Sequence, residues 1–184
     1  MNKPNSTYDV GLILKALAFA AHKHRVQKRK NVEASPYINH PIALADVLCN
    51  EGGITDEIVL CAALLHDTVE DTETTQEELT EVFGKVISDI VMELTDNKAL
   101  PKDERKRIQI EHAHAPHASH QAKLVKLADK ICNLRDIATS PPDGWDLTRK
   151  QKYFDWAKQV IDAIRGVNVK LELIFDEAFA KGCA

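Results

Sequence analysis

The 184-residue sequence is poor in the residues that mark several large protein classes. It contains 4 cysteines, 7 glycines and 7 prolines, and aromatic residues make up only 5% of it. This composition excludes collagen-like and low-complexity chains, and it predicts a core built mainly from aliphatic side chains. With 44% hydrophobic and 28% charged residues, the chain can bury a substantial core. We therefore expect one globular domain over residues 1–184.

The cysteines form no pattern of their own. Cys49, Cys61, Cys132 and Cys183 are widely spaced and include no CxxC pair, which favours reduced, buried thiols. No apolar run reaches the roughly 20 residues that span a membrane. The N-terminus also lacks the hydrophobic stretch and cleavage site of a secretory signal. These absences predict a cytoplasmic protein with no membrane partner.

The charge is nearly balanced, with 24 Lys and Arg against 28 Asp and Glu and a net charge of −4. Such a balance gives no general attraction to a nucleic acid polymer or to an acidic membrane. Basic residues do gather in two places, which are Arg25, Lys28, Arg29 and Lys30, and Lys102, Arg105, Lys106 and Arg107. Because Arg and Lys both bind phosphate oxygens, two such clusters fit a substrate with separated phosphates. Each cluster could instead be a solvated helix face.

Apolar residues recur with a period of 3.6 residues along nearly the whole chain, and no useful stretch alternates with period two. The sequence therefore predicts an all-α fold. The expected helices cover residues 10–21, 41–51, 56–65, 76–83, 86–94, 101–111, 124–138, 153–164 and 171–178. Three of these helices have an expected N-terminal cap: Ser6 for residues 10–21, Thr55 for residues 56–65 and Thr75 for residues 76–83.

Four polar residues lie in or beside apolar helices, where burying a polar side chain without a partner costs free energy. His66 and Asp67 end an apolar helix, His40 precedes another helix, and Asp129 lies inside the most hydrophobic helix. A buried carboxylate must be paired, hydrogen-bonded or bound to a metal. Two imidazoles and two carboxylates suit Mn²⁺, Fe²⁺, Zn²⁺ or Mg²⁺, with coordination positions left for water.

Two further carboxylates, Glu70 and Asp71, follow within one helical turn of these candidate ligands. A carboxylate at that place can orient water or take its proton in a hydrolytic attack. The alternative is purely structural. In it, the two aspartates cap helices or pair with Lys126 and Lys130, and the histidines are satisfied core groups.

Two other features are less informative. His112, His114, His117 and His120 are interleaved with Ala, Pro and Ser, which predicts a flexible, solvent-facing loop rather than a metal site. Tyr153 has a polar tip and could contact a nucleotide, whereas its neighbour at helical spacing, Trp156, is expected in the core.

Three motifs, in this order and spacing, resemble the HD-superfamily hydrolase domain of the RelA and SpoT proteins. They are Ser35-Pro-Tyr-Ile-Asn-His-Pro41, Ala62-Ala-Leu-Leu-His-Asp-Thr-Val-Glu-Asp-Thr72 and Val125-Lys-Leu-Ala-Asp-Lys-Ile-Cys-Asn-Leu-Arg135. The likeness covers essentially the whole chain and is greatest to the stand-alone small alarmone hydrolases. Two departures occur in one loop, where Ala34 replaces a common Gly and two extra residues separate Arg29 from His40.

The resemblance implies Mn²⁺-dependent hydrolysis of guanosine tetraphosphate or pentaphosphate at the 3′-pyrophosphate, which yields GDP or GTP and pyrophosphate. It would place the metal on His40, His66, Asp67 and Asp129, and the attacking water beside Glu70 and Asp71. It would place the nucleotide against Arg29, Lys30, Asn133 and Tyr153. Two alternatives remain: hydrolysis of another phosphorylated nucleotide, such as NADPH, and a nucleotide-binding module without catalysis. A homo-oligomer is also compatible with the resemblance.

Overall fold

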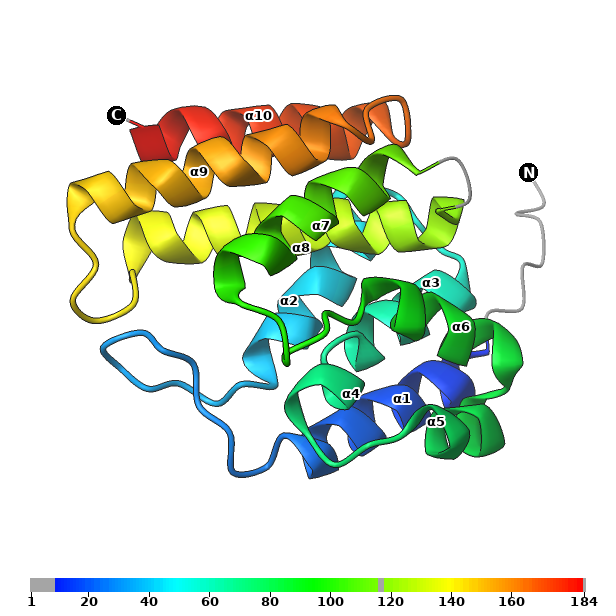
Figure 1. The fold of residues 1–184 in the computed structure, drawn as a ribbon. Helices are drawn as coiled ribbons and strands as arrows, with labels where there is room; N and C mark the ends of the chain where they lie inside the picture. The colour runs from blue at the N-terminus through cyan, green and yellow to red at the C-terminus, as the bar shows by residue number, and fades with distance from the viewer. Residues whose placement is uncertain (1–8, 116–117, 184) are drawn as a thin grey trace.

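The computed structural model describes residues 9–115 and 118–183, and all regular structure in that part is helical (Figure 1). The first helices are α1 (Val10–Lys23), α2 (Asn39–Asp46), a π-helical turn η1 (Val47–Glu51), α3 (Glu57–Leu65) and α4 (Thr68–Asp71). The others are α5 (Gln76–Phe83), α6 (Lys85–Leu94), α7 (Lys102–His114), α8 (His120–Thr139), α9 (Leu147–Asp162) and α10 (Val169–Cys183). Extended backbone pairing in these residues is limited to two isolated bridges, Lys28 with Pro36 and Asn31 with Pro142. The all-α prediction is confirmed.

Helix α8 is the centre of the fold. In Figure 1 it runs through the middle of the molecule, with α9 and α10 on one side and α2 and α3 on the other. Its buried residues include Leu124, Leu127, Ile131 and Leu134, each at most 3% exposed. Helix α3 is also apolar on nearly every face, and all its residues from Val59 to Leu65 are buried. Polar groups carried by these two helices are therefore held rigidly inside the protein.

The helix starts agree with the sequence in part. Thr75 caps α5 as predicted, because its hydroxyl accepts a hydrogen bond from the Glu78 amide. The prediction for Thr55 is wrong: the neighbouring Asp56 caps α3 through the amide of Ile58, at 2.9 Å. Ser6 lies outside the described residues. Asp9, three residues later in the sequence, caps α1: its carboxylate accepts a hydrogen bond from the Leu12 amide.

The histidine-rich tract differs from its prediction. His112 and His114 belong to the last turn of α7, and His120 is the first residue of α8, so these three are not in a loop. Helix formation continues past the expected end at residue 111 because the intervening residues are mostly alanine and histidine, which a helix tolerates. His117 lies outside the described residues.

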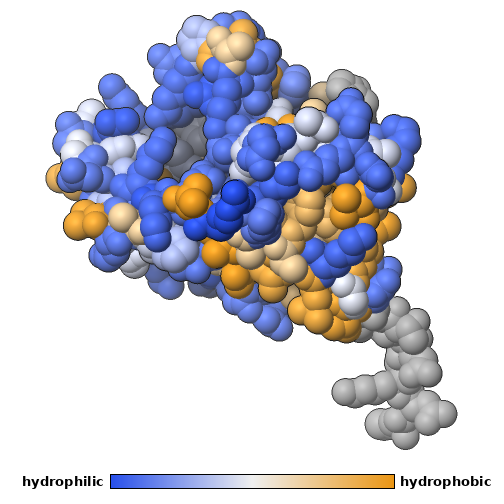
Figure 2. All heavy atoms as spheres, turned by 90° about the horizontal axis from the view of Figure 1, so that it is seen from below, coloured by the Kyte–Doolittle hydropathy of each residue, from blue (hydrophilic) through white to orange (hydrophobic). Residues whose placement is uncertain are grey.

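The surface carries one notable apolar area. Val10 and Leu14, on the outer face of α1, are 59% and 57% exposed. Figure 2 shows a hydrophobic patch on the face seen from below, in the lower right part of the view. Within the described residues, no helix is both long and apolar enough to cross a membrane. Cys49, Cys61 and Cys132 are free thiols, and Cys61 and Cys132 are buried as predicted, whereas Cys49 is only partly buried.

Candidate metal and hydrolase site

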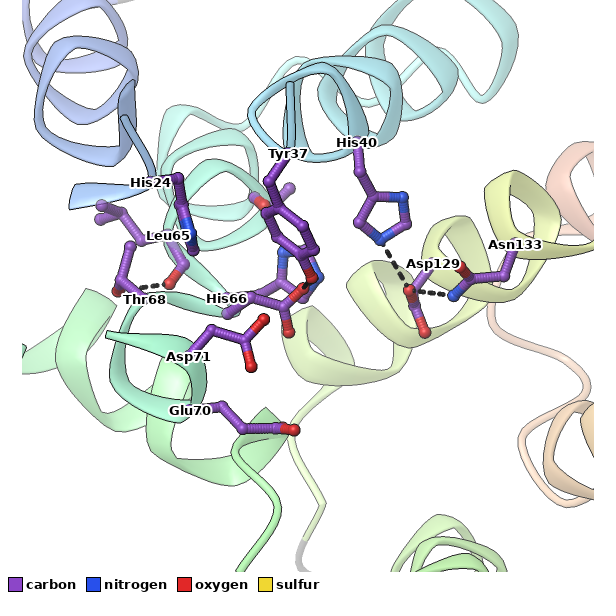
Figure 3. Close-up of polar contacts among 12 residues, drawn as sticks. His24, Tyr37, His40, Leu65, His66, Thr68, Glu70, Asp71, Asp129 and Asn133 are labelled. Carbon is purple, nitrogen blue, oxygen red and sulfur yellow. Dashed lines mark hydrogen bonds and ion pairs between the residues drawn. The ribbon is translucent and has the colours of Figure 1, made fainter. Parts of the chain in front are cut away.

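Three of the expected ligands come together from three helices. His40 is the second residue of α2, His66 is the C-cap of α3, and Asp129 lies in the middle of α8. One potential ligand atom from each lies within 4.8 Å of the others. Both histidines are buried, and Figure 3 shows the side chains converging on one point. The group has the donor set and the dimensions to hold a divalent metal ion.

The hydrogen bonding of His66 prepares it to bind a cation. Its Nδ1 lies 2.7 Å from the carbonyl oxygen of Ala63, which fixes the proton on that nitrogen. The other nitrogen, Nε2, is buried without a hydrogen-bond partner in the described residues, although Asp67 Oδ2 is 2.9 Å away. Two lone pairs at that distance repel each other unless a positive charge lies between them. A metal ion or a proton fits this requirement.

Electrostatics around His66 agree with that reading. Burial opposes a charge on the imidazole, but the Asp67 carboxylate outweighs burial and raises the pKa of His66 to about 9. The same interaction holds the pKa of Asp67 below its usual range despite burial. The Asp67 carboxylate therefore favours a positive charge at this place, carried by a metal ion or by a proton.

Asp129 is fixed by a network of short contacts. Its Oδ1 lies 3.2 Å from His40 Nε2 and accepts a 2.6 Å hydrogen bond from Asn133 Nδ2, one turn later on α8 (Figure 3). Its Oδ2 accepts a 2.8 Å bond from Lys130 Nζ. Burial alone would favour the neutral acid, but Lys130 and His40 hold the pKa of Asp129 well below its usual range. The predicted pairing of Asp129 with Lys130 therefore coexists with the metal group, whereas Lys126 makes no such pair.

Asp67 is placed differently from the other candidate ligands. It lies beside the group of three, and its Oδ2 accepts a hydrogen bond from the hydroxyl of Tyr37. Burial and the charge of Asp67 raise the pKa of that hydroxyl, so Tyr37 remains a donor. The assignment of Asp67 as a fourth ligand stays a prediction.

Glu70 and Asp71 occupy a short helix, α4, that the sequence did not predict. Glu70 Oε2 accepts a 3.1 Å bond from the amide of Asp96, and burial together with Asp67 raises its pKa to about 6. Asp71 accepts a 2.7 Å bond from Gln27 Nε2 and forms an ion pair with Lys98. Glu70 is thus the carboxylate better suited to exchange a proton near neutral pH.

Two adjoining cavities open beside these groups. The smaller one, which we call the deep cavity because it holds the metal group, has a volume of about 160 Å³ and is lined by His66, Asp67, Asp96, Lys126, Asp129 and Lys130, among others. The outer cavity, of about 760 Å³, is lined by residues that include Lys30, Asp71, Lys98, Arg105, Trp145 and Tyr153. Both are lined by Arg29, Tyr37, His40, Glu70 and Asn133. A substrate in the outer cavity can therefore reach the metal group.

The predicted nucleotide contacts lie along these walls. Arg29 Nη2 donates to Asn133 Oδ1 at 3.2 Å and to Asp136 Oδ2 at 2.5 Å. Lys30 is exposed at the wall of the outer cavity, and Tyr153 packs edge-on against Trp156. The loop before α2 that carries the two basic residues is closed by a 2.8 Å bond from the Arg29 amide to the Ser35 carbonyl. In this loop Ala34 has a φ of 47°, the left-handed conformation that glycine adopts without strain.

The two basic clusters are only partly directed at the cavity. Arg105 lines the outer cavity, whereas Arg107 pairs with Glu111 on the surface of α7. Lys102 lies over the ring of Trp145, and its pKa is lowered by burial and by the nearby positive charge of Arg149. Such mutual repulsion among cations favours the binding of an anion.

Several site residues were missed by sequence reasoning. Tyr37 stood inside a quoted motif without an assigned role, and Gln27, Asp96 and Lys98 had no local signal. Trp156 was expected in the core but is only partly buried, and its Nε1 donates to the carbonyl of Lys106 at 3.1 Å. These roles depend on contacts between segments that are distant along the chain.

Comparisons with known proteins agree with this arrangement. The HD domain family matches residues 16–154. The guanosine-3′,5′-bis(diphosphate) 3′-pyrophosphohydrolase MESH1 of Xenopus tropicalis is 57% identical over 93% of this chain and 94% of its own. The protein of the same name from Homo sapiens is 56% identical over 87% of this chain and 88% of its own.

A solved structure gives the same result for the fold. It is described as a metazoan ortholog of SpoT that hydrolyses ppGpp, and it matches with a TM-score of 0.90 at 48% identity, over 97% of this chain and 100% of that one. The family model and these relatives cover most of the sequence, and the site lies within the matched residues. The chain belongs to the HD domain family, in the group that includes the MESH1 proteins and the metazoan SpoT orthologs.

Proposed function

We propose that this protein hydrolyses guanosine 3′,5′-bis(diphosphate) and the related pentaphosphate at the 3′-pyrophosphate. The products are GDP or GTP and pyrophosphate, and the substrate is a free cytoplasmic nucleotide rather than a polymer. The observation that carries the proposal is the group of His40, His66 and Asp129, which could hold a metal ion, beside Glu70 in a cavity that adjoins a larger one with basic walls. The names of the similar MESH1 proteins support the same activity.

The ion we propose is Mn²⁺, because a mixed set of imidazole and carboxylate ligands suits it and leaves coordination positions open. His40, His66 and Asp129 would hold it, with Asp67 as a fourth ligand. When bound, a divalent cation neutralises phosphate charge and makes a coordinated water more acidic.

The chain's own groups then carry the proton and position the substrate. Glu70, whose pKa is raised to about 6, accepts a proton from the attacking water as the oxygen bonds to the 3′ phosphorus. The bond from that phosphorus to the 3′ oxygen breaks, and the 3′ oxygen takes up a proton from solvent. Asp71, anchored by Gln27 and Lys98, orients the water. Arg29 and Lys30 bind phosphates, while Asn133 and Tyr153 contact the nucleotide.

A product assay on metal-stripped protein tests this proposal most directly. Mn²⁺ is added back, and guanosine tetraphosphate, guanosine pentaphosphate and NADPH are offered separately. Release of pyrophosphate and GDP from the tetraphosphate is the expected result. Orthophosphate released only from NADPH would identify the other nucleotide as substrate, and binding without any product would identify a module that has lost catalysis.

Replacement of the basic residues is expected to weaken substrate binding. Arg29→Ala and Lys30→Ala each remove a positive charge that the polyphosphate feels in both the ground state and the transition state, so KM should rise. A charge-assisted hydrogen bond contributes about 1.5 to 3 kcal/mol, which corresponds to roughly 10- to 150-fold. Steady-state kinetics at two salt concentrations measure the effect, and added salt should weaken the wild type more than the variants.

Arg25→Ala is the matched control, because Arg25 belongs to the same basic cluster but bonds to the His22 carbonyl and does not line the outer cavity. It should keep the wild-type KM. If Arg29→Ala and Lys30→Ala also keep that value for every nucleotide, the cluster is a solvated surface and their assignment is wrong.

Metal binding is expected to strengthen as the pH rises. Because Asp67 raises the pKa of His66 to about 9, the metal must displace a proton from the imidazole throughout the neutral range. Between pH 6 and 8, the affinity for Mn²⁺ should therefore rise up to about tenfold per pH unit. Calorimetric titration in buffers of different ionisation enthalpy measures both the affinity and the proton released. An affinity independent of pH would contradict this account of His66.

A further inference from the structure

Lys126 lies one turn before Asp129 on α8, and its side chain lines the deep cavity together with His66 and Asp67. It does not line the outer cavity. Lys126 therefore lies in the cavity that holds His66 and Asp129, and not among the basic residues that line only the outer cavity. A ligand group that occupies the deep cavity beside the metal group can therefore contact this ammonium.

The charge of Lys126 is not balanced by a neighbouring contact. Three basic residues line the deep cavity, and two of them are paired: Arg29 with Asp136 at 2.5 Å and Lys130 with Asp129 at 2.8 Å. Lys126 has neither a hydrogen bond nor an ion pair with any residue of the described chain. Burial and the nearby Lys130 lower the pKa of Lys126, although Asp129, Asp96 and Asp67 favour the charged form from a distance.

Close packing does not account for this position. Lys126 also lines a third cavity of about 310 Å³, bounded by Leu94, Ile108 and Ala122, so there is space on both sides of its side chain. Leaving a partly buried ammonium without a partner is unfavourable unless an anion binds there. Both oxygens of Asp129 are already engaged by other groups.

We propose that Lys126 binds the distal phosphate of the 3′-diphosphate and retains it as pyrophosphate leaves. The inference rests on the function proposed above. Cleavage occurs at the phosphorus attached to the 3′ oxygen, which must lie near the metal group, and Lys126 lines the same cavity, where the second phosphate can reach it. Lys30 lines only the outer cavity and Arg29 lines both cavities, so these two residues remain available for the other phosphates of the nucleotide. Lys126 then makes the site selective for a diphosphate over a monophosphate.

The test compares Lys126→Met with Lys126→Arg. Lys123→Met is the matched control, because Lys123 precedes Lys126 by one turn on α8 and lines only the third cavity. Each Mn²⁺-loaded protein is titrated calorimetrically with pyrophosphate and with orthophosphate. Lys126→Met should bind pyrophosphate roughly 10- to 150-fold more weakly, as expected for one charge-assisted contact. Its affinity for orthophosphate should change by less than about threefold, a limit below that range. Lys126→Arg and Lys123→Met should bind both anions nearly as the wild type does.

Equal losses for the two anions, or unchanged pyrophosphate binding, would overturn the proposal. Loss of Mn²⁺ from Lys126→Met would also overturn it, because the lysine would then support the metal group instead. Turnover of guanosine tetraphosphate by the wild type is measured in parallel. An inactive wild type refutes the proposed function, whereas an active wild type with an unaffected Lys126→Met variant refutes only the role of Lys126.

Discussion

Asp129→Ala is expected to abolish turnover and to lower the bound metal. On the proposed assignment, the substitution removes one ligand oxygen and also the negative charge that would offset the cation in a buried site. It leaves the ammonium of Lys130 buried without its partner, so some loss of stability is expected as well. Elemental analysis of the purified protein, together with the product assay, measures both effects.

Two further variants separate the metal from the fold. Asp129→Asn keeps the size of the side chain but not its charge, and it should also be severely impaired. Asp89→Ala removes a surface carboxylate that pairs with Lys85, and such exposed pairs contribute little. It should retain activity and metal. If folded Asp129→Ala matches the wild type in both measurements, Asp129 is not a ligand.

Glu70→Gln and Asp71→Asn are expected to lower kcat by roughly a hundredfold or more, the usual scale for general acid–base catalysis. Each amide keeps the shape of the carboxylate but cannot accept the proton of water. Neither residue belongs to the group of three ligands, so the metal should stay bound and KM should change little. Single-turnover kinetics with metal-loaded variants isolate the chemical step.

Glu77→Gln provides the comparison for these two carboxylates, because Glu77 is exposed on α5, away from both cavities. Its kcat should equal that of the wild type. A Glu70 or Asp71 variant that loses the metal would show that the residue is a ligand. A defect confined to KM would show that it binds substrate.

The sequence predicts the helices well because a helix with one buried face has apolar residues that repeat with the helical period. Helix α8 is an example: its apolar residues recur at the expected spacing, and the prediction ends one residue before the observed end at Thr139. Helix α4 has only four residues, which is too short for a periodic apolar pattern to be recognised. The sequence prediction chose Thr55 although the neighbouring Asp56 belongs to a residue type that is preferred over Thr as an N-terminal cap.

The site was accessible to sequence reasoning where polar residues interrupt an apolar pattern. His66 and Asp129 stand out for this reason, and the motifs around them add the order and spacing of a family. Tyr37 and Asp96 do not stand out, because their contacts with Asp67 and Glu70 join segments 30 and 26 residues apart. Only the folded chain reveals such partners.

Because the metal group is assembled from three helices, metal binding is also expected to stabilise the folded protein. His40 and Asp129 are separated by 89 residues, so an unfolded chain cannot present them together. An ion that binds only the native state stabilises it by about 2.7 kcal/mol when its free concentration is 100 times the dissociation constant. The supply of metal in the cell would then govern how much of this protein escapes proteolysis, as well as how fast each molecule works.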